Sequence, residues 1–303
     1  MMNNTTIDTR AAYDRYIRRG EKTDALPYDM DPANGYLLRE EMEEKLVNAL
    51  CANNVLRSLC TGIRTSYNAY LPIVSSHGKA EWVPDGAAVP LVRDTFDRAV
   101  LDSNTLAATI RVTKELLKDS AIDIEQYLAD TFADRLADSE EAAFITGDGM
   151  DKPKGLIHQV NIGCETMAAG TVSLDDVLNL IFSVPEKYRR RGVLLMNDAT
   201  LLNLYRQCTE KGPNLWLGKN RDGQDTFFGV RIACCGSMPD AASGQVPVLF
   251  GDFKQVYIND CGKRSTKRLN ELYAASDHVG FMLSQRSGIK LTMPEAVKGL
   301  KVV

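Results

Sequence analysis

Apolar and polar residues alternate along residues 106–113, which is the period of a β-strand. The apolar set is Leu106, Ala108, Ile110 and Val112, and the intervening positions are mainly polar. We therefore expect a strand with one face on a core and the other face toward solvent.

The next segment changes to a helical period. Residues 122–145 contain neither Pro nor Gly, so one helix of roughly 35 Å can form at 1.5 Å per residue. We expect this spine helix at about residues 120–146, with Asp119 or Ser120 as the N-cap and Gly147 at its end. Its apolar stripe would be Ile124, Tyr127, Leu128, Phe132, Leu136 and Phe144.

The N-terminal segment has too few apolar residues to form a core of its own. Tyr13, Tyr16 and Ile17 share one face of a short amphipathic pattern in residues 12–19. The Pro, Asp, Asn and Gly residues that follow are typical of an extended arm, which needs another surface to lie on. Residues 36–59 return to helical spacing, and one or two short helices are expected there.

An irregular stretch at residues 75–95 has two Gly and two Pro and follows neither period. Loops this long in a compact domain are usually functional or disordered. Its large apolar residues are Trp82, Val83, Val89, Leu91 and Val92. Such residues need a cover, either a neighbouring subunit or the loop's own domain, and composition alone favours neither.

From about residue 170 short helices and strands alternate. Helical spacing in residues 174–188 and 199–208 flanks an apolar strand at 193–197, which indicates a separate α/β subdomain. The pattern returns to strands near Tyr257 and Lys290.

Composition mainly serves to exclude some classes of protein. The 303 residues are 44% hydrophobic and 25% charged, as in an ordinary globular protein and unlike a disordered or fibrous one. A net charge of −4 argues against a dedicated nucleic-acid binder, which would present a basic face, but it suits a container. The sequence shows neither a signal peptide nor a membrane span, so cytoplasmic synthesis is expected.

Candidate catalytic or ligand-binding constellations do not emerge. His77, His158 and His278 lack the spacing of a metal-binding pair, and the Gly-Asp-Gly at residues 147–149 is not a phosphate loop. The seven cysteines form no Cys-x-x-Cys pair and are expected to be reduced and mostly buried. The basic run at residues 187–191 is interpreted as a solvated helix end, with contact to packaged nucleic acid as the alternative. We expect no catalytic residue, cofactor or metal.

Several stretches occur together in an order that resembles a known family. They are KAEWVPDGAAVP, VTKELLKDS, EEAAFITGDGMDKPKGLI, LLMNDAT, NLWLG, FFGVRI, SMPD and LFGDFKQVYI. In order and spacing they are similar to the major capsid proteins of tailed bacteriophages, which have the Hong Kong 97-like fold. The resemblance covers roughly residues 31–297 and implies an α+β capsid fold.

The resemblance also implies a domain organisation. Its parts are an N-terminal arm (1–35), a first part of the peripheral domain (36–74), an extended E-loop hairpin (75–97), the peripheral domain with the long spine helix (98–165), an α/β axial domain (166–252), returning peripheral strands (253–295) and a C-terminal end near the axial domain (296–303). An unanchored arm, an exposed apolar loop and a separate α/β unit are also what the residue patterns indicate.

The function that the resemblance implies is structural and not enzymatic. The chain would be the head protein of a phage or prophage, self-assembling into hexamers and pentamers of an icosahedral shell around double-stranded DNA, without sequence-specific binding. Portal, scaffold and maturation protease would be its partners, with no membrane involved. The virion capsid would be its location, after assembly in the host cytoplasm. An encapsulin-like compartment shell is the nearest alternative and a cytosolic α/β enzyme a remote one.

On this interpretation the subunit contacts lie on the E-loop and the arm. The expected E-loop contacts are Lys79, Trp82, Val83, Val89, Leu91 and Val92, and the expected arm contacts are Tyr13, Tyr16 and Ile17. Some family members link an E-loop lysine to a neighbour's asparagine with the help of a glutamate. Lys79 is a possible lysine, but Asp277 and Ser284 stand where the asparagine and glutamate would be, so no cross-link is expected.

Overall fold

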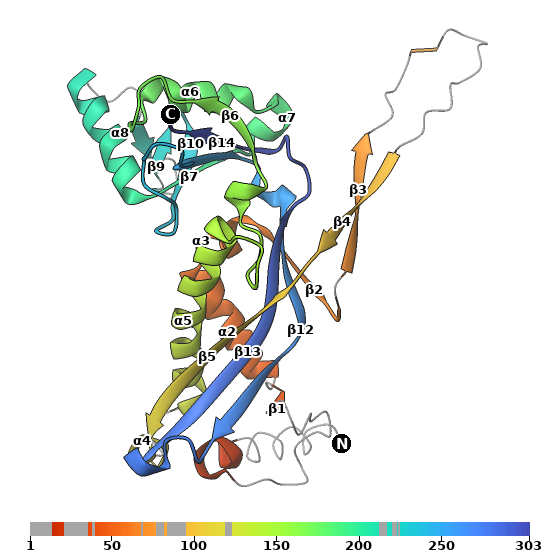
Figure 1. Cartoon of the computed structure of the whole chain (residues 1–303), viewed down its shortest axis with the longest axis vertical. Coiled ribbons are helices and arrows are strands. Elements are labelled where there is room, and N and C mark those ends of the chain that lie inside the picture. Colours follow the sequence, from red (N-terminus) through yellow and green to blue (C-terminus); the bar gives the residue numbers. More distant parts are fainter. Residues whose placement is uncertain are drawn as a thin grey trace.

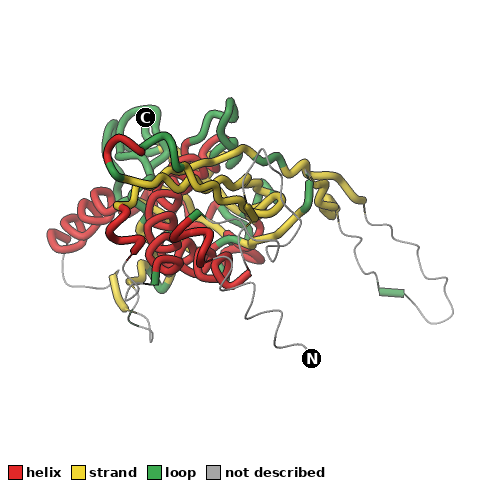
Figure 2. Tube along the Cα trace, turned by 90° about the horizontal axis from the view of Figure 1, so that it is seen from below, coloured by secondary structure: helices red, strands yellow, loops and turns green. Residues whose placement is uncertain are grey.

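The computed structural model describes residues 14–20, 36–37, 40–67, 69–76, 82–83, 95–118, 123–211, 217–219, 223 and 225–303. They form an elongated body, an α/β unit at one end of it, and a two-stranded hairpin that projects from its side (Figure 1). Figure 2 shows the hairpin strands leaving the body sideways. Among the described residues, no helix is long and apolar enough to cross a membrane.

The body is built on a five-stranded sheet. Its strands are β1 (Tyr36–Leu37), β2 (Thr61–Thr65), β5 (Asn104–Thr113), β12 (Val256–Leu269) and β13 (His278–Leu291). The long strands β12 and β13 pair antiparallel, β5 pairs antiparallel with β13, and β2 runs parallel to β12. The strand predicted at residues 106–113 is confirmed, because Ile110 and Val112 are buried while Arg111 and Thr113 are exposed.

Helices pack against this sheet. They are α2 (Glu40–Asn53), α3 (Val55–Leu59), α4 (Lys114–Lys118) and the long α5 (Ile124–Thr146). The spine helix is confirmed as α5, but its N-cap is Asp123, whose side chain accepts a hydrogen bond from the backbone N–H of Gln126. The two expected caps, Asp119 and Ser120, lie outside the described residues. Gly147 follows the helix, where a side chain would collide with nearby backbone carbonyls.

The α/β unit is a seven-stranded sheet with helices over it (Figure 1). Its strands, in spatial order, are β6 (Asn161–Glu165), β14 (Val297–Lys301), β11 (Val248–Gly251), β7 (Val193–Met196), β10 (Val230–Cys234), β9 (Asp225–Phe227) and β8 (Leu217–Lys219). Its helices are α6 (Leu174–Ser183), α7 (Glu186–Arg189) and α8 (Asp198–Lys211). Strand β6, which precedes the expected axial boundary at residue 166, belongs to this sheet.

Two apolar clusters fill the body. One packs α2 and α5 on β5 and β13, with Leu46, Phe132 and Leu283 among its fully buried members. The other joins the end of α5 to both sheets and includes Phe144 and Leu249. The body and the α/β unit therefore share the second cluster.

A polar layer lies between the two clusters, since along α5 Glu140 follows Ala137 of the first cluster and precedes Phe144 of the second. We call Glu43, Arg57, Glu140, Asp260 and Arg264 the ionic layer. The Arg57 guanidinium lies 2.6 Å from a Glu140 oxygen and 2.8 Å from Asp260. Arg264 lies 2.9 Å from Asp260 and 3.2 Å from Glu43. The side chains of Arg57, Glu140 and Arg264 are only 6%, 1% and 4% exposed, so these charges are stabilised by each other and hardly by water.

The charged groups of the ionic layer shift the pKa values of Asp260 and Arg57. Burial alone would raise the pKa of Asp260, but its hydrogen bonds and attraction to Arg57 and Arg264 outweigh burial and lower it. Burial would lower the pKa of the Arg57 guanidinium, but Glu140 and Asp260 raise it. The layer coincides with the irregularity in the β12 ladder between Cys261 and Ser265. It therefore ties the helices α2, α3 and α5 to one irregular point of β12.

Candidate subunit interface

The projecting hairpin consists of β3 (Ala69–Ser76) and β4 (Thr95–Leu101). The two strands pair antiparallel, with Tyr70 opposite Val100. Pairing starts at Ala69, ahead of the expected E-loop start at residue 75. Only two residues separate β4 from β5 of the body sheet, so the hairpin continues directly from the body.

The stem of the hairpin has an inner and an outer face. Ala99 and Leu101 point inward and are 5% and 2% exposed. Tyr70 and Val100 occupy the outer face and are 67% and 42% exposed, and nearby Tyr67 is 81% exposed. We call Tyr67, Tyr70 and Val100 the stem patch. Exposed apolar and aromatic side chains such as these are typical of protein interfaces.

The sequence analysis did not single out the stem patch. The available signal was the strand AYLPIV followed by the partner RAVL, in which Tyr70 and Val100 alternate with residues of the inner face. Their exposure depends on which face of the hairpin meets the body, and that choice is made by tertiary contacts between β4 and β13.

The E-loop residues that the sequence analysis named fall into two groups. Trp82 is fully exposed and Val83 is partly exposed, so the chain's own core does not cover the Trp82 side chain. The remaining four, Lys79, Val89, Leu91 and Val92, lie outside the described residues.

The expectation for the arm is corrected at two residues. Tyr16 and Ile17 lie in a helical turn at residues 14–19, and they are 7% and 3% exposed within the first apolar cluster. The Tyr16 hydroxyl accepts a hydrogen bond from the backbone N–H of Arg268 at 3.3 Å. These side chains pack in their own chain, because burial in the first cluster removes their apolar surface from water, and they leave almost no surface for a neighbour. Tyr13 lies outside the described residues.

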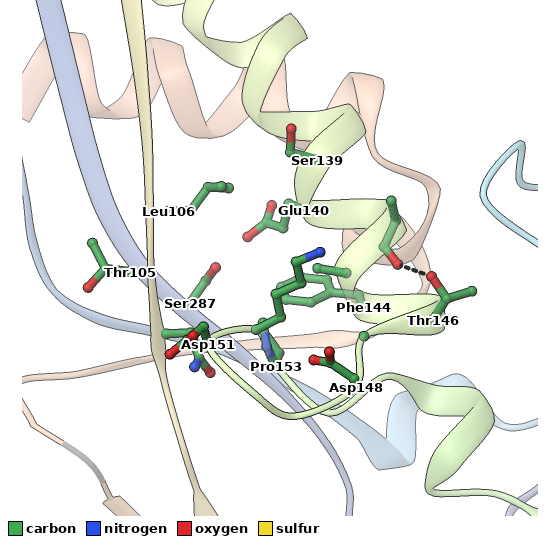
Figure 3. Close-up of a pocket in the computed structure, with 15 residues that line it drawn as sticks. Thr105, Leu106, Ser139, Glu140, Phe144, Thr146, Asp148, Asp151, Pro153 and Ser287 are labelled. Atoms are coloured by element: carbon green, nitrogen blue, oxygen red, sulfur yellow. Dashed lines mark hydrogen bonds between the residues drawn. The ribbon is translucent and has the colours of Figure 1, made fainter.

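A cavity of about 490 Å³ lies between α5, the start of β5 and the loop after α5 (Figure 3). Its lining includes Glu140, Asp148 and Ser287. The Glu140 carboxylate is held by Arg57, and an Asp148 oxygen accepts a hydrogen bond from the backbone N–H of Met150 at 2.9 Å. The lining residues include neither His nor Cys. These two carboxylates are thus engaged in bonds within the chain.

Other reactive side chains are dispersed. In the part of the chain that the structure describes, no three His, Cys, Asp or Glu side chains gather to hold a metal ion. Four cysteines are buried, while Cys51 and Cys234 are exposed and Cys164 is intermediate. Burial and the nearby charge of Glu141 raise the pKa of the Cys235 thiol to about 12, so it stays protonated at neutral pH. His77 lies outside the described residues.

A long spine helix beside a sheet of long strands, an α/β unit at one end and a projecting hairpin together define the class. The fold is the Hong Kong 97-like capsid fold, and it places the chain among structural shell proteins. The chain belongs to the phage capsid family, whose model matches residues 34–302. It is a structural major capsid protein of the phage type and not an enzyme.

Comparison with individual proteins agrees. The chain is similar to the capsid of a native GTA particle computed with C5 symmetry, with a TM-score of 0.64 and 25% identity, covering 91% of this chain and 96% of that one. It is 26% identical over 199 residues to the capsid polyprotein of Pseudomonas phage PAJU2, a match that covers 62% of this chain but only 29% of that protein.

The encapsulin fold is also similar. The holo-SrpI encapsulin complex from Synechococcus elongatus PCC 7942 aligns with a TM-score of 0.55 and 15% identity, covering 80% of this chain and 84% of that one. At this identity the likeness shows a common fold and nothing about contents.

Proposed function

We propose that this chain forms hexamers and pentamers of a closed icosahedral shell that encloses double-stranded DNA. The observation that carries the proposal is the projecting hairpin of a capsid-family chain, with Trp82 and the stem patch exposed and uncovered by their own core. Exposed aromatic surface of this kind is stabilised when a second copy covers it.

The proposal assigns a role to each part of the molecule. The hairpin is the E-loop, the body with α5 is the peripheral domain, and the α/β unit is the axial domain. A hairpin that reaches from one copy onto a different surface of the next makes a heterologous contact, which closes into rings when the rotation fits. The similar GTA capsid, computed with C5 symmetry, supports a five-fold ring.

The proposed contents of the shell are supported by the net charge of the chain, and the proposed partners by its membership of the phage capsid family. A net charge of −4 suits a wall that encloses DNA without adhering to it. Portal, scaffold and maturation protease are the proposed partners, and assembly takes place in the host cytoplasm before the protein becomes part of the virion.

Replacement of Trp82 by Ala tests the interface. Electron microscopy of purified wild-type protein should show hollow shells or capsomer rings, and W82A should show few of them while its far-ultraviolet circular dichroism is unchanged. Trp82→Phe is the matched control and should keep assembly, because it retains an aromatic side chain. Wild-type protein that stays monomeric or dimeric at high concentration would overturn the proposal.

Particle contents separate the phage shell from an encapsulin-like compartment. Shells purified from the producing host should hold nuclease-protected double-stranded DNA when the other head proteins are present. Particles that carry a co-purifying enzyme and lack DNA under those conditions would support the compartment, whose fold this chain shares.

Covalent cross-linking is not part of the proposal. The Asp277 carboxylate pairs with the Lys114 ammonium at 2.6 Å, and the Ser284 hydroxyl lies 2.8 Å from that of Ser265. Neither position offers an amide for a lysine to attack. Particles boiled in detergent should run as one band near 33.5 kDa, and a ladder of multiples would contradict this.

A further inference from the structure

The two ends of strand β7 in the α/β unit differ in charge. At its amino end, α7 and the following turn present Lys187, Arg189, Arg190 and Arg191. Arg231 belongs to the same end, because it pairs with Val193 at the start of β7 and is exposed. Glu186 and Glu295 offset part of this charge. We call this surface the basic end.

The carboxyl ends of β7 and β10 carry the opposite charge. Asp198 follows β7 and is exposed. Asp240 follows β10, is exposed, and accepts a hydrogen bond from the Asn197 side chain at 2.6 Å. We call Asp198 and Asp240 the acidic end. Residues 197–199 and 235–241 contain no Lys or Arg, and the four-residue strand β7 separates the two ends by about 13 Å or more.

The two ends also face different directions. Figure 1 shows α7 on the side of the α/β unit toward the projecting hairpin, and α8, which begins at Asp198, on the opposite side. A ring of identical copies brings one side of each copy against the other side of the next. In a ring whose circumference runs along the direction of β7, the basic end of one copy would face the acidic end of the next.

We propose that the basic end of one copy docks on the acidic end of the next copy within a ring of the shell. The inference rests on the proposed function, since it requires a ring, and it names a second contact surface away from the hairpin. Complementary charge favours this register and penalises rings in which like ends meet.

The side chains at the basic end suit a protein partner. The ion pairs Lys187–Glu295 and Arg190–Glu186 are exposed, so each stabilises the chain by only about 0–1 kcal/mol and can exchange partners at low cost. Phe182 is 69% exposed, and the Arg189 guanidinium lies 4.6 Å from the centre of its ring. Aromatic and Arg side chains together are typical of the buried centres of protein interfaces.

A nucleic-acid partner fits this surface less well. Polyphosphate sites concentrate cations that neutralise several phosphates, whereas two carboxylates and an exposed phenylalanine interrupt this cluster. If the basic end bound nucleic acid, the acidic end would have no role in that contact.

Charge reversal with rescue tests the docking. Three variants are compared with wild type: Arg190→Glu with Arg191→Glu, Asp198→Lys with Asp240→Lys, and the chain carrying all four changes. Each double variant places like charges in contact, so assembly yield measured by sedimentation should fall by at least roughly tenfold. The fourfold variant restores opposite charges between the four exchanged positions and should recover much of the yield.

A matched control and a second readout keep the test decisive. Lys152→Glu with Lys154→Glu makes the same net charge change as the Arg double variant, but on the loop after α5, and should assemble like wild type. Thermal unfolding of every variant checks the fold. Wild-type yield for both double variants, or a fourfold variant no better than either, would overturn the docking. Normal shells from the Arg variant with much less protected DNA would assign the basic end to nucleic acid instead. Failure of wild type itself would reject the proposed function.

Discussion

The ionic layer and the hairpin both place side chains in an unfavourable environment. The ionic layer buries charged groups, and the hairpin exposes apolar ones. In the ionic layer, five charged side chains lie inside the molecule, where bonds within 2.6 to 3.2 Å compensate the loss of water. On and beside the hairpin, Trp82 and the stem patch expose apolar surface, and no core cluster of the described residues contains them. The first arrangement is complete within one copy, and the second is the one that we propose a neighbouring copy covers.

The difference separates folding from assembly. Removing a partner from the ionic layer leaves a buried charge without compensation, which destabilises the subunit. Removing an exposed aromatic side chain from the hairpin costs the isolated subunit little, because most of its surface is already in contact with water. We therefore expect the two sets of variants to fail in different assays.

Arg57→Ala should give the largest loss of stability. It leaves Glu140 buried without its partner, so the free energy of unfolding should drop by about 3–5 kcal/mol, measured by urea denaturation of unassembled subunits. Arg190→Ala is the control, since its pair with Glu186 is exposed and should cost about 0–1 kcal/mol. Equal effects would show that the ionic layer is solvated.

Ile17→Ala tests whether the N-terminal turn belongs to its own core. Ile17 is 3% exposed in the first cluster, so its truncation should lower the free energy of unfolding by about 2–5 kcal/mol. Unchanged stability of the unassembled subunit, combined with lost assembly, would return Ile17 to the subunit interface.

The pH dependence of stability tests the electrostatics of the ionic layer. The pKa of Asp260 is lower in the folded chain than its unfolded value of about 3.9. Its stabilising contribution is therefore complete above that value and is lost as the pH falls through the folded pKa. Wild type should lose stability on acidification below about pH 4 more steeply than Asp260→Asn, as followed by chemical denaturation. Asp138→Asn on the exposed side of α5 is the control for the loss of one carboxylate at the surface.

Tyr70→Ser should have the smallest effect on the subunit and still affect the shell. Its side chain is 67% exposed, so the free energy of unfolding should change by less than about 0.5 kcal/mol, while assembly yield falls because the neighbour loses an aromatic contact. Leu101→Ser on the inner face is the contrast, since Leu101 is 2% exposed and its loss should destabilise the unassembled subunit.

The sequence predicted the helices and strands that are specified by the pattern of residues within the element itself. The alternation at residues 106–113 and the uninterrupted helical stretch before Gly147 appear as β5 and α5. The family motifs supplied the arrangement of the parts, and the family match confirms the class. The helix start was missed because Asp119, Ser120 and Asp123 are all residue types that cap helices.

The contacts that the sequence could not predict join residues distant in the chain. Arg57 and Glu140 are 83 positions apart, and spacing carries no information about such a pair. The helical turn with Tyr16 and Ile17 was predicted from its apolar face. An apolar face does not specify whether it packs in the core of its own chain or on a neighbouring subunit. The outer side of the hairpin was missed for a similar reason, since alternation gives two faces without saying which one meets the body.

The division of the body into two apolar clusters by a charged layer has a consequence for how related chains diverge. Within either cluster, a change in the volume of one side chain can be compensated by a change in a neighbouring side chain. The sequence of each cluster can therefore change independently of the other. Arg57, Glu140, Asp260 and Arg264 share their bonds, and a change at one removes the compensation of the others. Across related capsid sequences we expect these four positions to change together or not at all.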